Sequence, residues 1–341
     1  MAPVRLPRAQ ILAFRRRMGA LDERLPRGKR SLRQAAWLGL QDSVPRAALL
    51  SIHARVEGTK PSTWRDPSLV QLWGPRHSAY VVAAVDLPYF SLGLLPDDVR
   101  GRERAYELAD RLRKHLGGNE MTYSRAGREL GGDPNRLRYA APTGTVIIRW
   151  EGAGQPTVRS VPPPEIDPGE ARLEVARRHL HVLGPSTPQA FARWAGIKPK
   201  GGATAFERLH ASLVPVRTPA GDAWILASDE AAFREAEGSP ARARLLPSGD
   251  AYLLAADREL LVADADRRRS LWPPSTVWPG GVMVGGELVG TWRRAHAAMT
   301  VQPWRRLSKS AREAVEEEAA SLPLPGVDRA VTVRWSDLET P

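Results

Sequence analysis

Three consecutive polar residues, Gln41, Asp42 and Ser43, separate two apolar runs near the start of the chain. The first run has a helical pattern that stops at Leu40. The second opens at Pro45, which a first helical position tolerates because its missing N–H would be unpaired there. Ser43 is a candidate N-cap of that second helix. The pattern predicts an amide, a carboxylate and a hydroxyl at a corner between packed helices, a rigid place from which to address a substrate. A plain polar turn with a capping serine is the simpler interpretation.

The elements expected to position this corner are helices, followed by a strand. Residues 4–19 form a basic amphipathic pattern whose arginine triplet, 15–17, is either a solvated face or a phosphate contact. Two helices flank the corner, and residues 62–72 look like a short third helix. Residues 73–83 read as a turn and a strand. Three helices followed by strands are the order of a winged helix-turn-helix, here over residues 1–95.

Three further units follow in the chain. Residues 96–161 combine a helix over 101–116, a short helix over 122–130 and a glycine-rich hairpin of a kind that can enter a DNA minor groove, although alone it is more simply an exposed hairpin. After the Pro162–Pro164 linker, residues 165–235 predict three helices and a wing strand. Residues 240–341 are rich in short strands and include an acidic helix. The predicted fold class is α+β, in four units along the chain.

The composition points to a polyanionic partner. The chain of 341 residues carries 50 basic and 38 acidic residues, a net charge of +12, and only six of the basic residues are lysines. Arginine binds phosphate bidentately, although a GC-rich genome also enriches it. There is no cysteine, and the seven histidines form no zinc-binding spacing, so we expect no metal and no cofactor. No apolar run is long enough for a membrane span, which predicts a cytoplasmic, nucleoid-associated protein without a membrane partner.

Three stretches together resemble the AlkZ-like winged-helix DNA glycosylases. They are residues 39–56, with the corner and Pro-Arg-Ala-Ala-Leu-Leu after it; residues 179–196, with Gly-Pro-Ser-Thr-Pro and Phe-Ala-Arg-Trp-Ala-Gly; and residues 290–293, Gly-Thr-Trp-Arg. The family usually reads Gln, an apolar residue, then Gln or Asp at the corner. This chain keeps Gln41 but has Asp42 in the middle and Ser43 in the third place.

The resemblance implies three tandem winged helices followed by a small C-terminal β-barrel. It also implies a monofunctional glycosylase acting on bulky N7-alkylguanine in double-stranded DNA, including antibiotic adducts and crosslinks. Such an enzyme breaks the bond between base and sugar through a cationic sugar, which a carboxylate can stabilise while an amide or hydroxyl holds water. Gln41, Asp42 and Ser43 are the catalytic candidates. Either Asp42 is the catalytic carboxylate, which we favour because serine stabilises positive charge poorly, or residues 41 and 43 face the site and residue 42 does not. The motif contains no lysine, which argues against a Schiff-base lyase.

Candidate DNA contacts lie at the corner, the wings and the third unit, and a monomer is expected. A winged-helix transcription regulator without catalytic activity is the alternative, because winged helices are commoner as binders than as enzymes. A glycosylase-like protein that binds lesions without cutting them is a third possibility. For His179 and His181, packing at a helix end competes with a phosphate contact. The candidate DNA-binding residues are Arg46, Arg76, His77, Arg149, Gln155, Arg159, His179, His181, Lys198 and Lys200.

Overall fold

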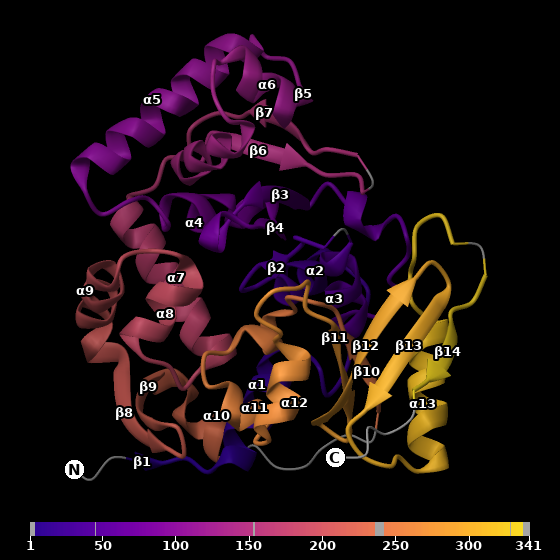
Figure 1. Cartoon of the computed structure of the whole chain (residues 1–341). Helices are drawn as coiled ribbons and strands as arrows, with labels where there is room; N and C mark the ends of the chain where they lie inside the picture. Colours follow the sequence, from indigo (N-terminus) through magenta and orange to yellow (C-terminus); the bar gives the residue numbers. More distant parts are fainter. Residues whose placement is uncertain (1–3, 45, 153, 236–241, 328, 337–341) are drawn as a thin grey trace.

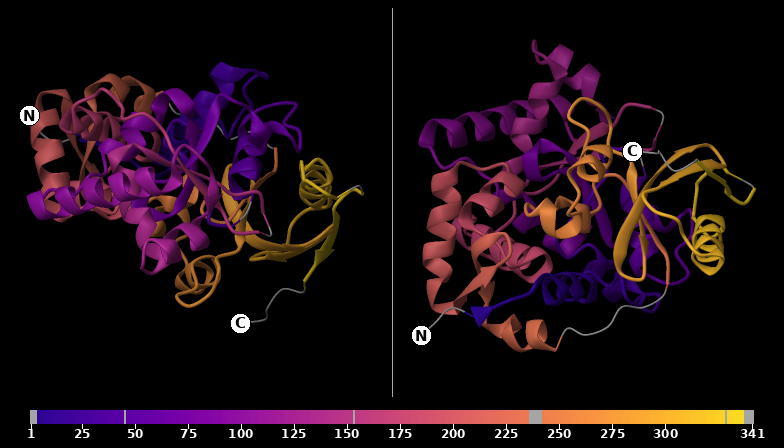
Figure 2. Two further views of the ribbon diagram at one scale, coloured as in Figure 1. Left: turned by 90° about the horizontal axis from the view of Figure 1, so that it is seen from above. Right: turned by 60° about the horizontal axis from the view of Figure 1, so that its bottom comes forward.

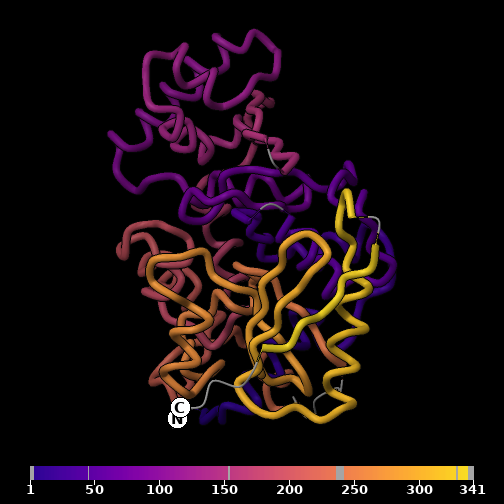
Figure 3. Tube along the Cα trace, turned by 45° about the vertical axis from the view of Figure 1, so that its right-hand side comes forward, coloured from indigo at the N-terminus to yellow at the C-terminus, as the bar shows by residue number. Residues whose placement is uncertain are grey.

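The computed structural model describes residues 4–44, 46–152, 154–235, 242–327 and 329–336. It has three β-sheets and many helices between them, which confirms the expected α+β class. Residues 96–161 form the upper part in Figure 1 and in Figure 3, above the rest of the molecule. Both views of Figure 2 place the C-terminal strands on the side away from residues 165–235.

The first part of the chain contains more strand than its sequence suggests. A single 3₁₀ turn, Thr63–Arg65, and a strand occupy residues 62–72, so the predicted third helix is wrong. Pro67 interrupts the helical pattern, and the β-prone residues that follow pair with the next strand. The elements are β1 (Val4–Arg5), α1 (Arg8–Met18), α2 (Lys29–Ala35), β2 (Leu40–Gln41), α3 (Ala47–Arg55), β3 (Leu69–Trp73), β4 (Ala79–Ala83) and α4 (Leu87–Leu92).

Two of the three arginines in the α1 triplet are buried in the interior, whereas Arg17 is exposed. Arg15 and Arg16 are 1% and 4% exposed. Arg15 forms a bidentate ion pair with Asp257, at 2.7 and 2.8 Å, and Arg16 pairs with Asp22 at 2.8 Å. Neither predicted role, a solvated face or a phosphate contact, applies to these two residues, because buried charges need such partners.

Residues 96–161 share a sheet with the residues before them. The six strands run in the order β2-β4-β3-β6-β7-β5, and Gln71 of β3 pairs with Ile148 of β6 across the two units. Asp98 caps the long helix by accepting from the Gly101 N–H at 2.7 Å. The elements are α5 (Val99–Leu116), β5 (Met121–Thr122), α6 (Tyr123–Glu129), a 3₁₀ segment (Pro134–Thr143), β6 (Val146–Arg149) and β7 (Thr157–Ser160).

The third unit has the three predicted helices, and its predicted wing strand is the second strand of a hairpin. Asp167 and Thr187 cap its first two helices through their side chains. The N-terminal strand β1 pairs in parallel with β8, so the start of the chain completes this small sheet. The elements are α7 (Pro168–Leu183), α8 (Pro188–Ala195), α9 (Pro199–Leu209), β8 (Leu213–Thr218), β9 (Gly221–Leu226) and α10 (Glu230–Arg234).

The C-terminal sheet is open, so the predicted β-barrel is wrong. Its described strands run β10-β11-β12-β13-β14 without pairing between the first and the last. Helix α13 packs against both of these strands instead. Gly285 and Gly286, at φ of 60° and 76°, make a tight turn between two of these strands. The elements are β10 (Arg244–Leu246), α11 (Arg258–Leu261), α12 (Ala265–Leu271), β11 (Gly280–Val284), β12 (Glu287–Ala295), β13 (Ala298–Pro303), α13 (Lys309–Ala320) and β14 (Thr332–Trp335).

One hydrophobic core joins distant parts of the chain around the first unit. Phe14, Tyr80, Phe191, Phe233 and Leu253 are all buried members of it. They come from α1, β4, α8, α10 and the segment before α11. Strand β4, which carries the partner residues of the Gln41 corner, is therefore held by contributions from all these segments.

Candidate active site

The predicted corner begins on a strand, not at the end of a helix. Gln41 lies opposite Tyr80 in the antiparallel pair of β2 and β4. The Asp42 N–H extends this ladder by donating to the Ala79 carbonyl at 2.7 Å. Side chains alternate along an extended chain. Asp42 is accordingly buried, whereas Gln41 is partly exposed and Ser43 is exposed.

The Asp42 carboxylate faces the interior and binds the start of the next helix. It is 2% exposed. Its Oδ1 accepts from the Ala48 N–H at 3.0 Å, and its Oδ2 accepts from Gln71 Nε2 at 2.9 Å. The N-cap position is Arg46, so the prediction of Ser43 as N-cap is wrong. The side chain that reaches the helix start is the Asp42 carboxylate, not the Ser43 hydroxyl. Pro45 lies outside the described residues.

Burial dominates the titration of this carboxyl. Desolvation raises the pKa of Asp42 to about 6, while the Ala48 N–H, the Arg46 charge and the Gln71 amide oppose the shift. The hydrogen bonds that Asp42 accepts from Ala48 and Gln71 are both buried. Of the two arrangements the sequence left open, the structure has the one in which residues 41 and 43 point one way and residue 42 the other.

Gln41 is held in a defined orientation by its neighbours. Arg76 Nη2 donates to Gln41 Oε1 at 2.9 Å, and Gln41 Nε2 donates to Ser43 Oγ at 3.2 Å. Arg76 itself is anchored, since its Nη1 donates to the Trp194 carbonyl at 2.7 Å and its Nη2 lies 3.3 Å from the Tyr80 hydroxyl. An amide fixed in this way can present its remaining N–H and lone pair to a water or a substrate.

A turn from the C-terminal part closes one side of Gln41. Gly249 adopts φ of 74°, and a Cβ placed on it would lie 3.1 Å from Gln41 Cδ. The next residue, Asp250, is 1% exposed and pairs with both Nη atoms of Arg55 at 2.7 Å. It also accepts from Ser51 Oγ at 2.7 Å. This buried network fixes the turn against α3, and so fixes the wall beside Gln41.

Several predicted DNA contacts gather where the β6–β7 hairpin meets α3. Arg46 donates to the Trp150 carbonyl at 2.9 Å and lies 3.6 Å from the centre of the Trp64 ring. Arg149 approaches the same ring, at 5.7 Å. The candidates on the hairpin are all exposed, as a DNA contact requires: Arg149, Gln155 and Arg159.

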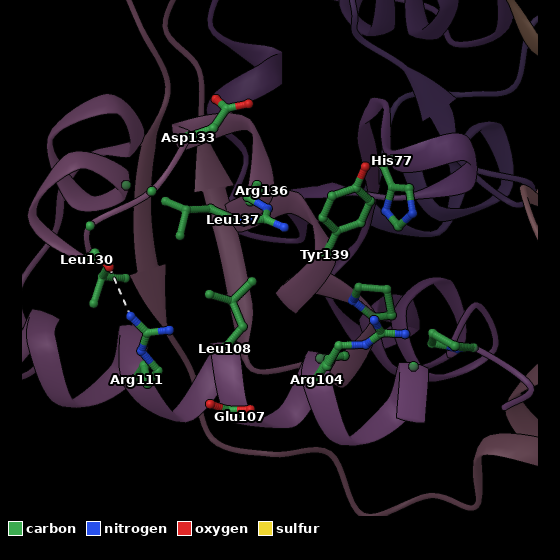
Figure 4. Close-up of a pocket in the computed structure, with 17 residues that line it drawn as sticks. His77, Arg104, Glu107, Leu108, Arg111, Leu130, Asp133, Arg136, Leu137 and Tyr139 are labelled. Atoms are coloured by element: carbon green, nitrogen blue, oxygen red, sulfur yellow. Dashed lines mark hydrogen bonds between the residues drawn. The ribbon is translucent and has the colours of Figure 1, made fainter. Parts of the chain in front are cut away.

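His77 follows Arg76 but faces a different space. Its ring meets the edge of Tyr139 at 4.8 Å, and its buried Nδ1 has no hydrogen-bond partner among the described residues. Figure 4 shows the two rings at one end of a cavity of about 530 Å³ between α5, α6 and the 134–143 segment. Burial lowers the pKa of His77. Arginines point into this cavity alongside leucines: Arg104, Arg111, Arg136, Leu108, Leu130 and Leu137.

The two histidines of α7 make protein contacts. His179 is 3% exposed, its Nε2 lies 2.9 Å from Ser186 Oγ, and burial lowers its pKa to about 3. A buried neutral ring offers DNA no surface, so the phosphate contact expected of His179 is replaced by the competing role, packing. His181 Nδ1 lies 2.9 Å from an oxygen of Asp229.

The segment starting at Lys198 is a helix start, not a loose loop. The Gly201 N–H donates to the Lys198 carbonyl at 2.9 Å, and the Gly202 N–H approaches the same oxygen at 3.4 Å. These N–H groups are therefore engaged within α9 and are not free to bind a phosphate. Lys198 pairs with Asp98 at 3.0 Å, and Lys200 is exposed.

Sequence reasoning missed the residues that support the corner. Tyr80, Gln71 and Gly249 lie 30 or more positions from Gln41 and carry no local motif. Only Tyr80 had a signal, since it belongs to the predicted strand 73–83. In the part of the chain that the structure covers, no group of three or more His, Asp or Glu could hold a metal ion. No described helix is long and apolar enough to cross a membrane.

Comparison with known proteins identifies the class of enzyme. The family of AlkZ-like DNA glycosylases matches residues 32–323. The chain belongs to this family and is a DNA glycosylase, an enzyme of DNA repair. Family membership favours the enzyme over the transcription regulator that the sequence left open.

Among solved structures, the fold is similar to that of the Streptomyces sahachiroi DNA glycosylase AlkZ. The TM-score is 0.79 at 20% sequence identity, and the match covers 98% of this chain and all of the other. A search of curated proteins gives no match.

Proposed function

We propose that this enzyme is a monofunctional glycosylase that excises bulky N7-alkylguanine adducts from double-stranded DNA and leaves an abasic site. Its lesions include adducts and crosslinks formed by natural-product antibiotics, so it serves self-resistance or base excision repair. It acts as a monomer. The observation that carries the proposal is the Gln41–Ser43 pair, which Arg76 fixes at an accessible corner of the sheet.

The leaving group explains why these modest side chains suffice. Alkylation at N7 places a positive charge on guanine, so the N9–C1′ bond breaks readily and the base departs with the electron pair. The sugar develops oxocarbenium character, a water adds at C1′, and its proton passes to solvent. Gln41 and Ser43 can hold that water. The inward-facing Asp42 fixes the strand and the helix start instead of touching the sugar.

The open side of the corner suits a large lesion. Ser43 is exposed and Gln41 partly exposed. Ordinary base flipping seats the base in a snug pocket, which would not admit a bulky adduct. No lysine lies between Lys29 and Lys60. The corner therefore lacks the amine that a Schiff-base lyase needs, which supports an abasic site as the product.

The test is single-turnover base release from a duplex with one bulky N7-alkylguanine. We expect wild type to release the base and Gln41→Ala to be slower by roughly 10²-fold or more, the effect typical of losing one positioned polar group. Asp42→Asn is the matched variant at the next residue, and it should stay within a few-fold of wild type. An unmodified duplex should release nothing.

The outcomes test the proposed substrate and the proposed site residues separately. If wild type releases no base from this duplex, the proposed substrate is wrong. If Gln41→Ala is as fast as wild type, or Asp42→Asn is the slow variant while remaining folded, the assignment of the corner residues is wrong.

A further inference from the structure

The turn that carries Arg76 has a strained backbone. Arg76 and His77 have φ of 55° and 53°, and among the described residues they are the only neighbouring pair of non-glycine residues at positive φ. This left-handed conformation is unfavourable for a residue with a Cβ. Such strain persists only where the surrounding structure fixes the backbone, and it is concentrated at functional sites. The contacts that fix this turn therefore also affect Gln41, which Arg76 binds.

The end of α8 supplies two of these contacts. Gly196, the C-cap residue of α8, has φ of 75°. A Cβ placed on it would lie 2.7 Å from the Arg76 N and 2.8 Å from the Arg76 Cα, so only glycine allows the two backbones to approach this closely. Two residues earlier, the Trp194 carbonyl accepts from Arg76 Nη1 at 2.7 Å. The end of α8 thus holds both the backbone and the guanidinium of Arg76.

Helix α8 is itself fixed at both ends. At its start, the Thr187 side chain accepts from the Ala190 N–H at 3.1 Å. At its end, Trp194 is 4% exposed, and its ring lies 6.3 Å from that of Phe191, between centroids. Both rings belong to the same core as Tyr80 of β4. Because interiors of this kind are close-packed, the end of α8 cannot give way when a group is added to it.

We propose that Gly196 and the Trp194 carbonyl are positioning groups of the glycosylase reaction. They fix Arg76, and Arg76 in turn orients the Gln41 amide by donating to its Oε1 at 2.9 Å. Their role rests on the proposed function, in which Gln41 holds the attacking water. Residues 179–196, the second stretch that the sequence singles out, end at this contact although they are far from Gln41 in the chain. The third unit thereby takes part in the chemistry without touching the substrate.

Gly196→Ala tests this role in single-turnover base release from the N7-alkylguanine duplex. The new methyl group meets backbone atoms of Arg76, so the turn must shift and Gln41 is no longer held in place. We expect the maximal rate to fall by about ten-fold or more. The enzyme concentration that gives half of this rate should stay unchanged, because the substitution removes no group that contacts DNA. A variant that had only lost folded protein would instead show a smaller active fraction at the wild-type maximal rate.

The matched control is Gly117→Ala. Gly117 is also a helix C-cap, that of α5, and its φ is 54°, but a Cβ placed on it would meet nothing within 4 Å. This variant has the same unfavourable backbone conformation and should keep the wild-type rate. Gly196→Asn is the second test variant, because asparagine tolerates the left-handed conformation better than alanine while its Cβ still meets Arg76. It should be more stable to urea than Gly196→Ala and equally slow.

Two further measurements show whether the effect passes through Arg76 to Gln41. In protein that already carries Arg76→Gln, adding Gly196→Ala should slow release no further, because the bond to Gln41 is already lost. The NMR signal of the Gln41 side-chain amide, in protein with isotope-labelled glutamine, is assigned by its loss in Gln41→Ala. It should shift in Gly196→Ala and not in Gly117→Ala, and this measurement requires no substrate.

The outcomes distinguish the positioning role from the proposed substrate. A Gly196→Ala protein with the wild-type rate, independent rate losses in the double variant, or an unshifted Gln41 signal each overturns the positioning role. If wild type releases no base but the Gln41 signal shifts as expected, the contact from α8 to Gln41 is supported and the proposed substrate is wrong.

Discussion

Replacing Asp42 with asparagine should change the pH dependence of folding more than the rate of base release. Burial raises the pKa of Asp42 from 3.8 to about 6 in the folded protein. The folded state therefore binds this proton more tightly than the unfolded chain, and wild-type stability rises as the pH falls from above 6 to below 4. A shift of this size corresponds to about 3 kcal/mol. An asparagine at this position has no such dependence.

The substitution also disturbs one hydrogen bond. Gln71 Nε2 donates to Asp42 Oδ2, whereas Gln71 Oε1 accepts from the Trp150 N–H at 2.6 Å. The Gln71 amide cannot flip without losing its hydrogen bond from the Trp150 N–H. If the side-chain NH2 of an asparagine at position 42 points toward Gln71, it therefore meets another donor, Gln71 Nε2. Losing one buried hydrogen bond costs about 1–3 kcal/mol. At pH 5 the variant should be less stable than wild type, and by pH 8 the difference should shrink or reverse.

Urea unfolding at pH 5, 6, 7 and 8 measures this difference. The control is Asp222→Asn, a substitution at an exposed carboxylate, which should leave the pH profile of the free energy of unfolding nearly parallel to that of wild type. If the Asp42→Asn profile is parallel as well, the carboxyl does not titrate as its burial indicates. The reasoning on its inward orientation would then be refuted.

Three other substitutions test the support of the corner. Arg76→Gln should slow single-turnover base release by about ten-fold with little change in stability, because it frees Gln41 Oε1. Arg55→Met should lower the free energy of unfolding by about 3–5 kcal/mol in urea titrations, since it leaves Asp250 buried without its cation. Gly249→Ala should both destabilise the protein by about 1 kcal/mol and slow release, because the new methyl group meets Gln41 at positive φ; equal activity would contradict this packing.

Local patterns predicted the helices well and the long-range pairings poorly. Asp167 and Pro168 predicted the start of α7, and the acidic residues before α5 predicted the start of that helix. By contrast, the end of the predicted helix 62–72 belongs to the strand Leu69–Trp73, because β4 is available to pair with it. The open C-terminal sheet likewise depends on where α13 packs, and no local residue pattern encodes that position.

The candidate site was found from its motif, but its orientation could not be predicted. Gln41, Asp42 and Ser43 are consecutive, so the sequence left open which of them faces outward. The orientation of these side chains is determined by β4, which pairs with Gln41, and by Gln71, which binds Asp42. His179 shows the same limit, since its burial depends on Ser186 and the rings of α8.

The shared six-stranded sheet sets the distance between Gln41 and the β6–β7 hairpin. Three strand steps separate β2 from β6, and at about 4.8 Å each they span roughly 14 Å. That length is comparable with four base-pair steps of B-DNA, at about 3.4 Å each. The separation between Gln41 and the hairpin is thus set by the number of intervening strands. Changing the length of the loop between β6 and β7 therefore leaves this separation unchanged.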